Sequence, residues 1–134
     1  MRKDSREEAL KFLYSYGFDC EVDISDEIFD FSKLNNQDKD FCNNLIQTYL
    51  QNKEQLSKDL AEISDNYRIE RMFAIDKTVI LLAMCEMKYF SDIPYLVSIK
   101  EAMELVKKYS HEDSITFVNG ILGAYKTNLE KING

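Results

Sequence analysis

Apolar residues recur at steps of three and four along nearly the whole chain, which is the spacing of one face of an α-helix. Between residues 72 and 90 they occupy almost every side of the helix, which predicts the most deeply buried element. No segment alternates between apolar and polar residues over a convincing length, so the pattern predicts an all-α fold. The other clear apolar stripes cover residues 9–14, 41–50, 56–63, 99–106 and 117–132.

Helix boundaries should be few, because the chain has only four glycines and one proline. A shorter apolar stripe at residues 24–31 adds one more helix and brings the expected number to about seven. Gly17 ends the first helix. Pro94 marks another boundary, because the residue before a proline disfavours helical backbone.

One domain is expected over residues 1–134, with a division inside it. The connections predicted to be loosest lie at residues 18–36 and 64–70. They suggest an N-terminal bundle over about residues 1–66 and a C-terminal bundle over about residues 67–134. No internal repeat or low-complexity segment suggests a further division.

Negative charge is concentrated in one early segment. The chain has a net charge of −7, and residues 18–40 contain eight acids but only two lysines. This charge excludes a uniformly basic surface of the kind that binds nucleic acid without specificity. The acidic segment either serves solubility or confines a polyanion to another face of the molecule, and the sequence leaves both interpretations open.

The composition indicates a cytoplasmic protein with no membrane segment. The three cysteines form no CxxC pair and there is one histidine, which argues against a zinc site and a disulfide scaffold. The longest apolar run, residues 79–85, is far shorter than the roughly 20 residues of a membrane-spanning helix. At the N-terminus, charges of both signs precede any apolar stretch, so no secretory signal is expected.

No catalytic pattern is visible in the sequence. The P-loop, the GxSxG nucleophile turn, the HExxH zinc pattern and the dinucleotide fingerprint are all missing. The GxxG pattern at residues 120–123 lies inside a helical stripe, and His111 is expected at the exposed start of a helix. Cys85 is expected to be an inert buried thiol. We therefore predict a binding module that is not an enzyme and uses no cofactor or metal.

Two segments carry side chains suited to RNA. Arg2, Lys3 and Arg6 lie at the start of the first helix, where cations oppose the helix dipole and gain no stability from it. Guanidinium groups form paired hydrogen bonds with phosphates. In the second segment, Phe117 offers a stacking surface for a base, and Asn119 offers hydrogen bonds to one. An ordinary charged terminus, and close helix packing at the glycine after Asn119, stay open as alternatives.

Two acids lie beside the most buried helix. Glu70 precedes it, and Asp76 interrupts the apolar stretch from Met72 to Met87. A carboxylate at Asp76 lies either at the rim of the surface or opposite a basic partner. A salt bridge at the rim contributes less than about 1 kcal/mol, so a purely stabilising role would be weak.

Three segments in the second half follow one long and ordered pattern: IDKTVILLAMCEM (75–87), DIPYLVSIKEAMELVKKYS (92–110) and EDSITFVNGILGAY (112–125). With them, residues 67–125 resemble the NusB family of bacterial transcription antitermination factors. The stretch REEALKFLY (6–14) is similar to the arginine-led first helix of that family. Some ribosomal-RNA cytosine methyltransferases begin with the same module, but this chain ends soon after it, so the stand-alone factor is expected.

The resemblance implies two antiparallel three-helix bundles with one additional helix. It also implies pairing with the small-subunit ribosomal protein that doubles as Nus factor E. The pair binds the boxA element of nascent ribosomal RNA transcripts and keeps RNA polymerase elongating within the antitermination complex. Homodimerisation occurs in the family and would cover the partner surface. By position, RNA contacts are expected at Arg2, Lys3, Arg6, Phe117 and Asn119, and partner contacts at Glu70 and Asp76.

Three departures from the family pattern reduce the positive charge available for RNA. Asp4 interrupts the arginine region, Thr116 replaces a basic residue, and Leu81 stands where an arginine is often found. Because each lost phosphate contact weakens binding, we expect weak RNA binding by the isolated chain, with the partner supplying much of the affinity. The alternative is a protein-only adaptor of the ribosomal protein with little RNA binding of its own. A fragment of an RNA-modifying enzyme is disfavoured by the missing catalytic groups.

Overall fold

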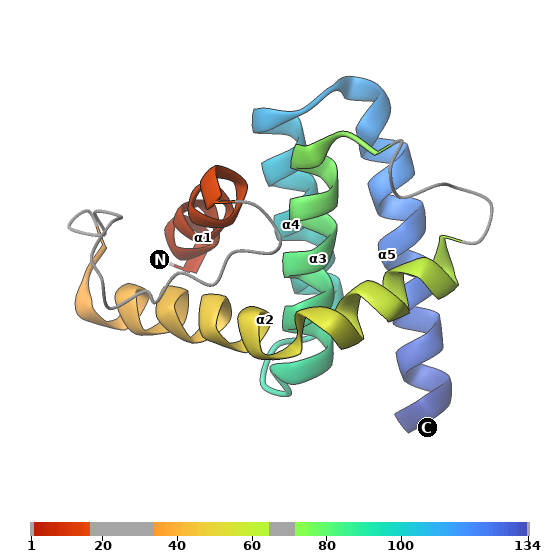
Figure 1. The fold of residues 1–134 in the computed structure, drawn as a ribbon, viewed down its shortest axis with the longest axis horizontal. Helices are drawn as coiled ribbons and strands as arrows, with labels where there is room; N and C mark the ends of the chain where they lie inside the picture. The colour runs from red at the N-terminus through yellow and green to blue at the C-terminus, as the bar shows by residue number, and fades with distance from the viewer. Residues whose placement is uncertain (1, 17–33, 65–71, 134) are drawn as a thin grey trace.

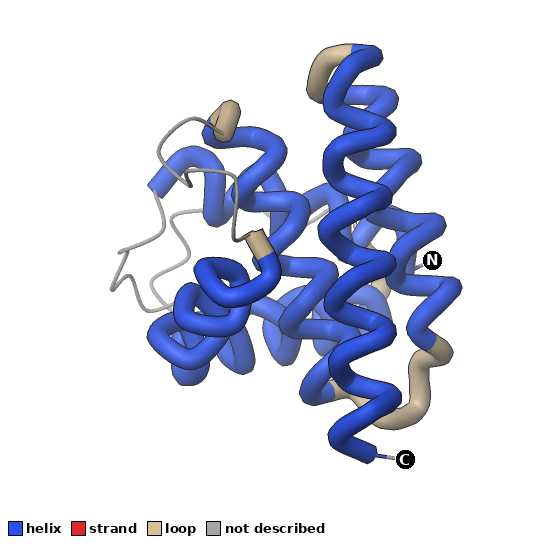
Figure 2. Tube along the Cα trace, turned by 90° about the vertical axis from the view of Figure 1, so that its right-hand side faces the viewer, coloured by secondary structure: helices blue, strands red, loops and turns tan. Residues whose placement is uncertain are grey.

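The computed structural model describes residues 2–16, 34–64 and 72–133, and every regular element in these ranges is an α-helix (Figures 1 and 2). The all-α fold predicted from the apolar spacing is confirmed. In chain order the helices are α1 (Arg2–Tyr16), α2 (Asn36–Ile63), α3 (Ala74–Tyr89), α4 (Tyr95–Tyr109) and α5 (Glu112–Asn133).

A single helix, α2, spans the two apolar stripes at residues 41–50 and 56–63, which the sequence predicts as separate helices. The buried residues Tyr49 and Leu56 are two helical turns apart, so the buried face continues without a break. The prediction of two helices here is therefore wrong. The further helix expected at residues 24–31 lies outside the described residues.

Helix α3 lies at the centre of the fold, as its apolar sequence predicts. All residues from Thr78 to Met87 are buried. Figure 1 shows α3, α4 and α5 side by side with alternating chain direction, and all three contribute to one hydrophobic core. They form an antiparallel three-helix bundle at the C-terminal end of the chain.

Helices α1 and α2 pack against this bundle. Figure 1 shows α2 running across α3, with α1 above it on the side of α3 and α4 that faces away from α5. Apolar side chains of α1 and α2 join the same core. The boundary expected near residues 66–67 falls outside the described residues, so the division into two bundles stays a prediction.

The connection between α3 and α4 is short and well defined. The backbone N–H of Ile93 donates to the carbonyl of Phe90 at 3.1 Å, and Pro94, with extended backbone, precedes the first residue of α4. The boundary predicted at Pro94 is confirmed. This turn carries Asp92 beside the start of α1.

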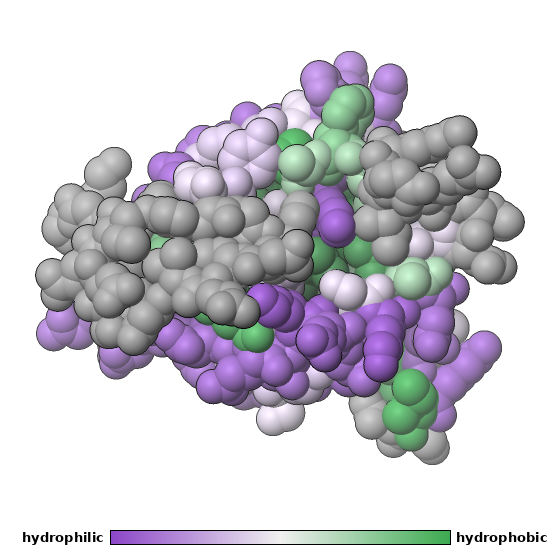
Figure 3. All heavy atoms as spheres, in the orientation of Figure 1, coloured by the Kyte–Doolittle hydropathy of each residue, from purple (hydrophilic) through white to green (hydrophobic). Residues whose placement is uncertain are grey.

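The visible face of α2 is hydrophilic. Figure 3 shows a polar band along α2, with apolar atoms emerging above it. Among the helices that the structure describes, none is long and apolar enough to cross a membrane.

Candidate functional site

The first turn of α1 presents two exposed cations, Arg2 and Lys3. The guanidinium of Arg2 lies 4.6 Å from the centre of the Phe41 ring, a cation–π distance. Its Nη2 also contacts Oδ2 of Asp92 at 3.5 Å, while half of the Arg2 side chain stays exposed. Arg2 is therefore held in one direction and still accessible to an anion.

The sequence predicts Arg6 as an RNA contact, but the structure buries its side chain. It is only 7% exposed. Its Nε donates to Oε2 of Glu86 at 2.8 Å, and its Nη2 donates to Oε1 of the same carboxylate at 2.5 Å. Since both bonds go to one buried acid, Arg6 contributes no free positive charge at the surface.

Glu86 is the acid that the sequence reasoning missed. It lies inside the most apolar helix and also accepts a hydrogen bond from Ser98 Oγ at 2.9 Å. The signal that identifies it is a carboxylate within an otherwise buried apolar run, because an ionised group at such a position requires a partner. The same reasoning applies to Asp76.

Phe117 and Asn119 lie on α5, away from the cationic end of α1. Figure 1 shows α3 and α4 between α1 and α5, so the two segments suited to RNA do not lie side by side. The two residues also differ in exposure: Phe117 is half-buried against the core, whereas Asn119 is exposed. Positions two apart on a helix point in different directions, so they do not form one surface.

Asp76 is buried rather than at the rim, with 2% exposure. Its two carboxylate oxygens accept hydrogen bonds from Ser110 Oγ at 2.5 Å and Ser114 Oγ at 2.6 Å. Asp76 thus ties the start of α3 to the corner between α4 and α5. Glu70, the other acid expected to face a partner, lies outside the described residues.

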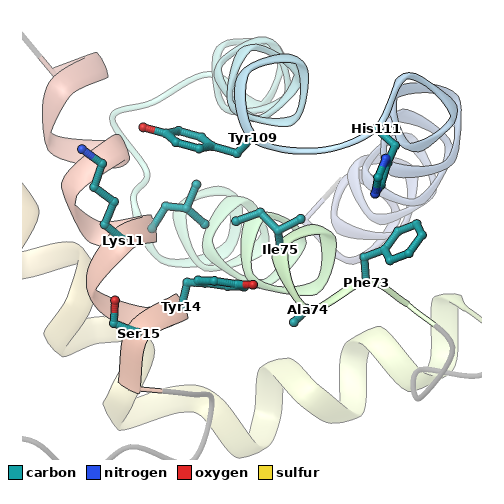
Figure 4. Close-up of a pocket in the computed structure, with 9 residues that line it drawn as sticks. Lys11, Tyr14, Ser15, Phe73, Ala74, Ile75, Tyr109 and His111 are labelled. Carbon is teal, nitrogen blue, oxygen red and sulfur yellow. The ribbon is translucent and has the colours of Figure 1, made fainter.

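A hollow of about 450 Å³ lies beside this corner, between α1, the start of α3 and the end of α4. Figure 4 shows aromatic rings around it, with Ile75 between them. Tyr14 is 53% exposed and Phe73 is 56% exposed. The ring of Phe73 lies 4.6 Å from that of His111. His111 is exposed and directly precedes α5, as the sequence predicts. We call this hollow the aromatic groove.

A charged cluster fastens α1 to the end of α4. Lys108 Nζ donates to Glu7 Oε1 at 2.6 Å, and the Tyr109 hydroxyl donates to the same oxygen. Burial alone would raise the pKa of Glu7, but these two hydrogen bonds and the Lys108 charge together hold it below its usual value. Glu7 is therefore ionised at neutral pH and holds the wall of the aromatic groove in place.

Two of the three cysteines are described, and both are buried. Burial, with a smaller contribution from Glu8, raises the pKa of Cys42 to about 12, and burial likewise raises that of Cys85. Both thiols stay protonated at neutral pH. The expectation of an inert Cys85 is in keeping with this position.

Sequence comparison links the chain to one family. The NusB family model matches residues 3–127. Transcription antitermination protein NusB of Dictyoglomus thermophilum is 36% identical, over 98% of this chain and 88% of that protein. The protein of the same description from Thermodesulfovibrio yellowstonii is 35% identical, over 90% of this chain and 88% of that protein.

Solved structures show the same fold. NusB of T. maritima matches with a TM-score of 0.85 and 28% identity, over 95% of this chain and 91% of that chain. A structure of antitermination factors NusB and NusE in complex with dsRNA matches with a TM-score of 0.83 and 22% identity, over 95% of this chain and 96% of that chain. The second likeness extends to the fold alone.

Proposed function

Because this chain belongs to the NusB family of transcription antitermination proteins, we propose that it binds boxA-type RNA in nascent ribosomal RNA transcripts. It does so as a heterodimer with the small-subunit ribosomal protein that serves as Nus factor E, and it promotes elongation by RNA polymerase. A solved structure of the same fold contains NusB and NusE in complex with dsRNA, which supports this pairing. The role is one of binding without catalysis, in the cytoplasm.

The observation that carries the proposal is the exposed cationic edge formed by Arg2 and Lys3. The Phe41 ring and Asp92 orient the Arg2 guanidinium before any ligand arrives, so little conformational entropy is lost when a phosphate binds. Asn119 offers a second polar contact on α5. Because α3 and α4 separate the two contacts, an RNA that reaches both must pass around the bundle.

The aromatic groove is the proposed docking surface for the ribosomal partner. Its half-exposed rings, Tyr14 and Phe73, have the amphipathic character that is enriched at protein interfaces. The exposed acids Glu112 and Asp113 follow His111 at its rim and suit a basic partner. Within this assignment, Glu70 stays a proposed partner contact, and Asp76 shapes the groove from inside.

A gel shift with boxA RNA tests the proposal, with the chain alone, with the ribosomal partner alone and with both. We expect weak retardation by either protein alone and clear retardation by the pair at moderate salt. An RNA affinity of the pair no greater than that of the partner alone would contradict RNA binding by this chain.

That second outcome corresponds to the alternative, a protein-only adaptor. The net charge of −7 and the neutralisation of Arg6 by Glu86 favour this alternative. Homodimerisation through the aromatic groove would compete with the partner. Light scattering of the chain, with and without the ribosomal protein, measures that competition.

A further inference from the structure

Arg6, Glu86 and Ser98 form a buried polar cluster where α1, α3 and α4 meet. Their exposed fractions are 7%, 3% and 2%. Arg6 gives two hydrogen bonds to the Glu86 carboxylate, and Ser98 gives a third. Taking an ion pair out of water is costly and adds little net stability, whereas a fixed geometry is the best-supported use of such a pair. The cluster is therefore expected to hold neighbouring helices in a fixed geometry.

The cluster lies directly beneath the cationic edge. Arg6 follows Arg2 by one helical turn, so the two side chains leave the same face of α1. Both guanidinium groups lie over the ring of Phe41, at 4.6 Å for Arg2 and 5.3 Å for Arg6. Arg6 is the inner member of this arrangement, fixed by Glu86, and Arg2 is the outer member, exposed to ligands.

The first turn of a helix frays unless something holds it. Two buried contacts hold this one: the pair between Arg6 and Glu86, and the Ser5 hydroxyl, which donates to the carbonyl of Asp38 at 2.8 Å. Only the first involves charge and connects α1 to both α3 and α4. Its loss would remove the contact that fixes this turn, and with it Arg2 and Lys3, relative to α3 and α4.

We propose that Arg6, Glu86 and Ser98 form a positioning cluster that aims the first turn of α1 at RNA, and that Arg6 itself does not contact phosphate. This inference rests on the proposed RNA-binding function. The charge of Arg6 is balanced inside the protein by Glu86, so of these three cations only Arg2 and Lys3 present positive charge to RNA.

The test measures boxA RNA affinity at several salt concentrations for the complex with the ribosomal partner. Arg6→Gln and Glu86→Gln should each weaken binding by on the order of tenfold, because contacting residues are energetically coupled. Neither should change the slope of affinity against salt, since neither residue binds phosphate. The double variant Arg6→Gln with Glu86→Gln keeps a buried hydrogen-bonding pair, so it should recover much of the RNA affinity.

The double variant decides the question even if a single variant fails to fold. It lacks the Arg6 charge, so a direct phosphate contact by Arg6 predicts a slope lowered by about 0.7. That lower slope, or a Glu86→Gln variant that binds RNA as well as the wild type, would overturn the positioning role.

Asp59→Asn is the matched control for general destabilisation. Asp59 also pairs a carboxylate with a cation, Lys88 at 2.9 Å, and accepts a bond from Tyr125, but it joins α2, α3 and α5. We expect a similar loss of thermal stability with unchanged RNA affinity. Equal loss of affinity in Asp59→Asn and Glu86→Gln would overturn the inference. Absence of RNA binding by the wild type would instead contradict the proposed function.

Discussion

The guanidinium of Arg2 is shared between the Phe41 ring and the Asp92 carboxylate. Asp92 is well exposed, with 66% of its side chain accessible, so the ion pair is a surface pair and contributes less than about 1 kcal/mol. A phosphate approaching Arg2 meets the negative charge of Asp92 as well. In the proposed RNA complex, Asp92 would therefore oppose the phosphate while it orients the arginine.

Replacing Asp92 with asparagine should therefore tighten RNA binding. We expect about a two- to fivefold gain in affinity at low salt, which corresponds to a surface charge interaction of less than about 1 kcal/mol. A filter-binding titration measures it, with Glu130→Gln as the control, because Glu130 is also exposed and pairs with a lysine at the far end of α5. A weaker Asp92→Asn complex would mean that orienting Arg2 matters more than removing the competing charge.

Single residues were the least predictable level from sequence. The cationic character of Arg2 and Lys3 can be read directly from the sequence, because it is a property of the residue type. The burial of Arg6 depends on Glu86, which is 80 positions away in the sequence. The local sequence shows that Glu86 lies in an apolar run and requires a partner, but it does not show that the partner is Arg6.

Gly120 lacks the close helix packing that is one explanation for a glycine inside a helix. Close packing against another helix is the usual reason for a glycine inside a helix, yet a Cβ built at Gly120 meets nothing within 4 Å. Helix packing therefore does not require this glycine. What the open position does allow is the approach of a ligand to the backbone of α5 next to Asn119.

Gly120→Ala should consequently stabilise the protein. Alanine is favoured over glycine in a helix interior by up to about 1 kcal/mol, and no steric cost offsets that gain here. Thermal or urea unfolding measures the change. Lower stability of the variant would mean that the α5 backbone at this position is not an ordinary exposed helix.

Helices α1 and α4 are joined by a pH-dependent contact. The pKa of Glu7 is lowered in the folded state, so its contribution to stability is present at neutral pH. The contribution is lost as the pH falls below about 4.3, the usual glutamate value, and through the lower folded-state pKa. Glu7→Gln should be less stable than the wild type at pH 7, and the gap should narrow in acid.

Urea unfolding of both proteins at neutral pH and at about pH 3 measures that gap. A difference in unfolding free energy that stays constant across this range would show that the Glu7 carboxylate does not act through its charge. The hydrogen bonds that lower the pKa of Glu7 come from Lys108 and Tyr109. Lys108→Gln should therefore also make the unfolding free energy less dependent on pH.

The helices themselves were largely predictable, because helical periodicity is a local property of the sequence. The buried helix α3 and the boundary at Pro94 were both expected. The continuity of α2 was not, since the polar residues between its two stripes lie on its exposed face and resemble a connection. Nothing in that stretch breaks a helix, and two full turns preserve the buried face.

At the scale of the whole molecule, the bundle separates the two predicted RNA-contact regions. The sequence places the start of α1 and the Asn119 segment in one family pattern, but their spatial relation is set by the packing of α3 and α4 between them. Tertiary packing of this kind cannot be derived from periodicity. The aromatic groove was missed for the same reason, because Tyr14 and Phe73 read as core residues within apolar stretches.

The most direct test of the account is the salt dependence of boxA RNA binding by the heterodimer with Arg2 and Lys3 both replaced by glutamine. Both side chains are exposed, so thermal stability should be close to that of the wild type. The account predicts weaker binding and a salt slope reduced by about 1.4, since each phosphate contact with a single strand contributes about 0.7. An unchanged slope with unchanged affinity would contradict the claim that this edge binds RNA.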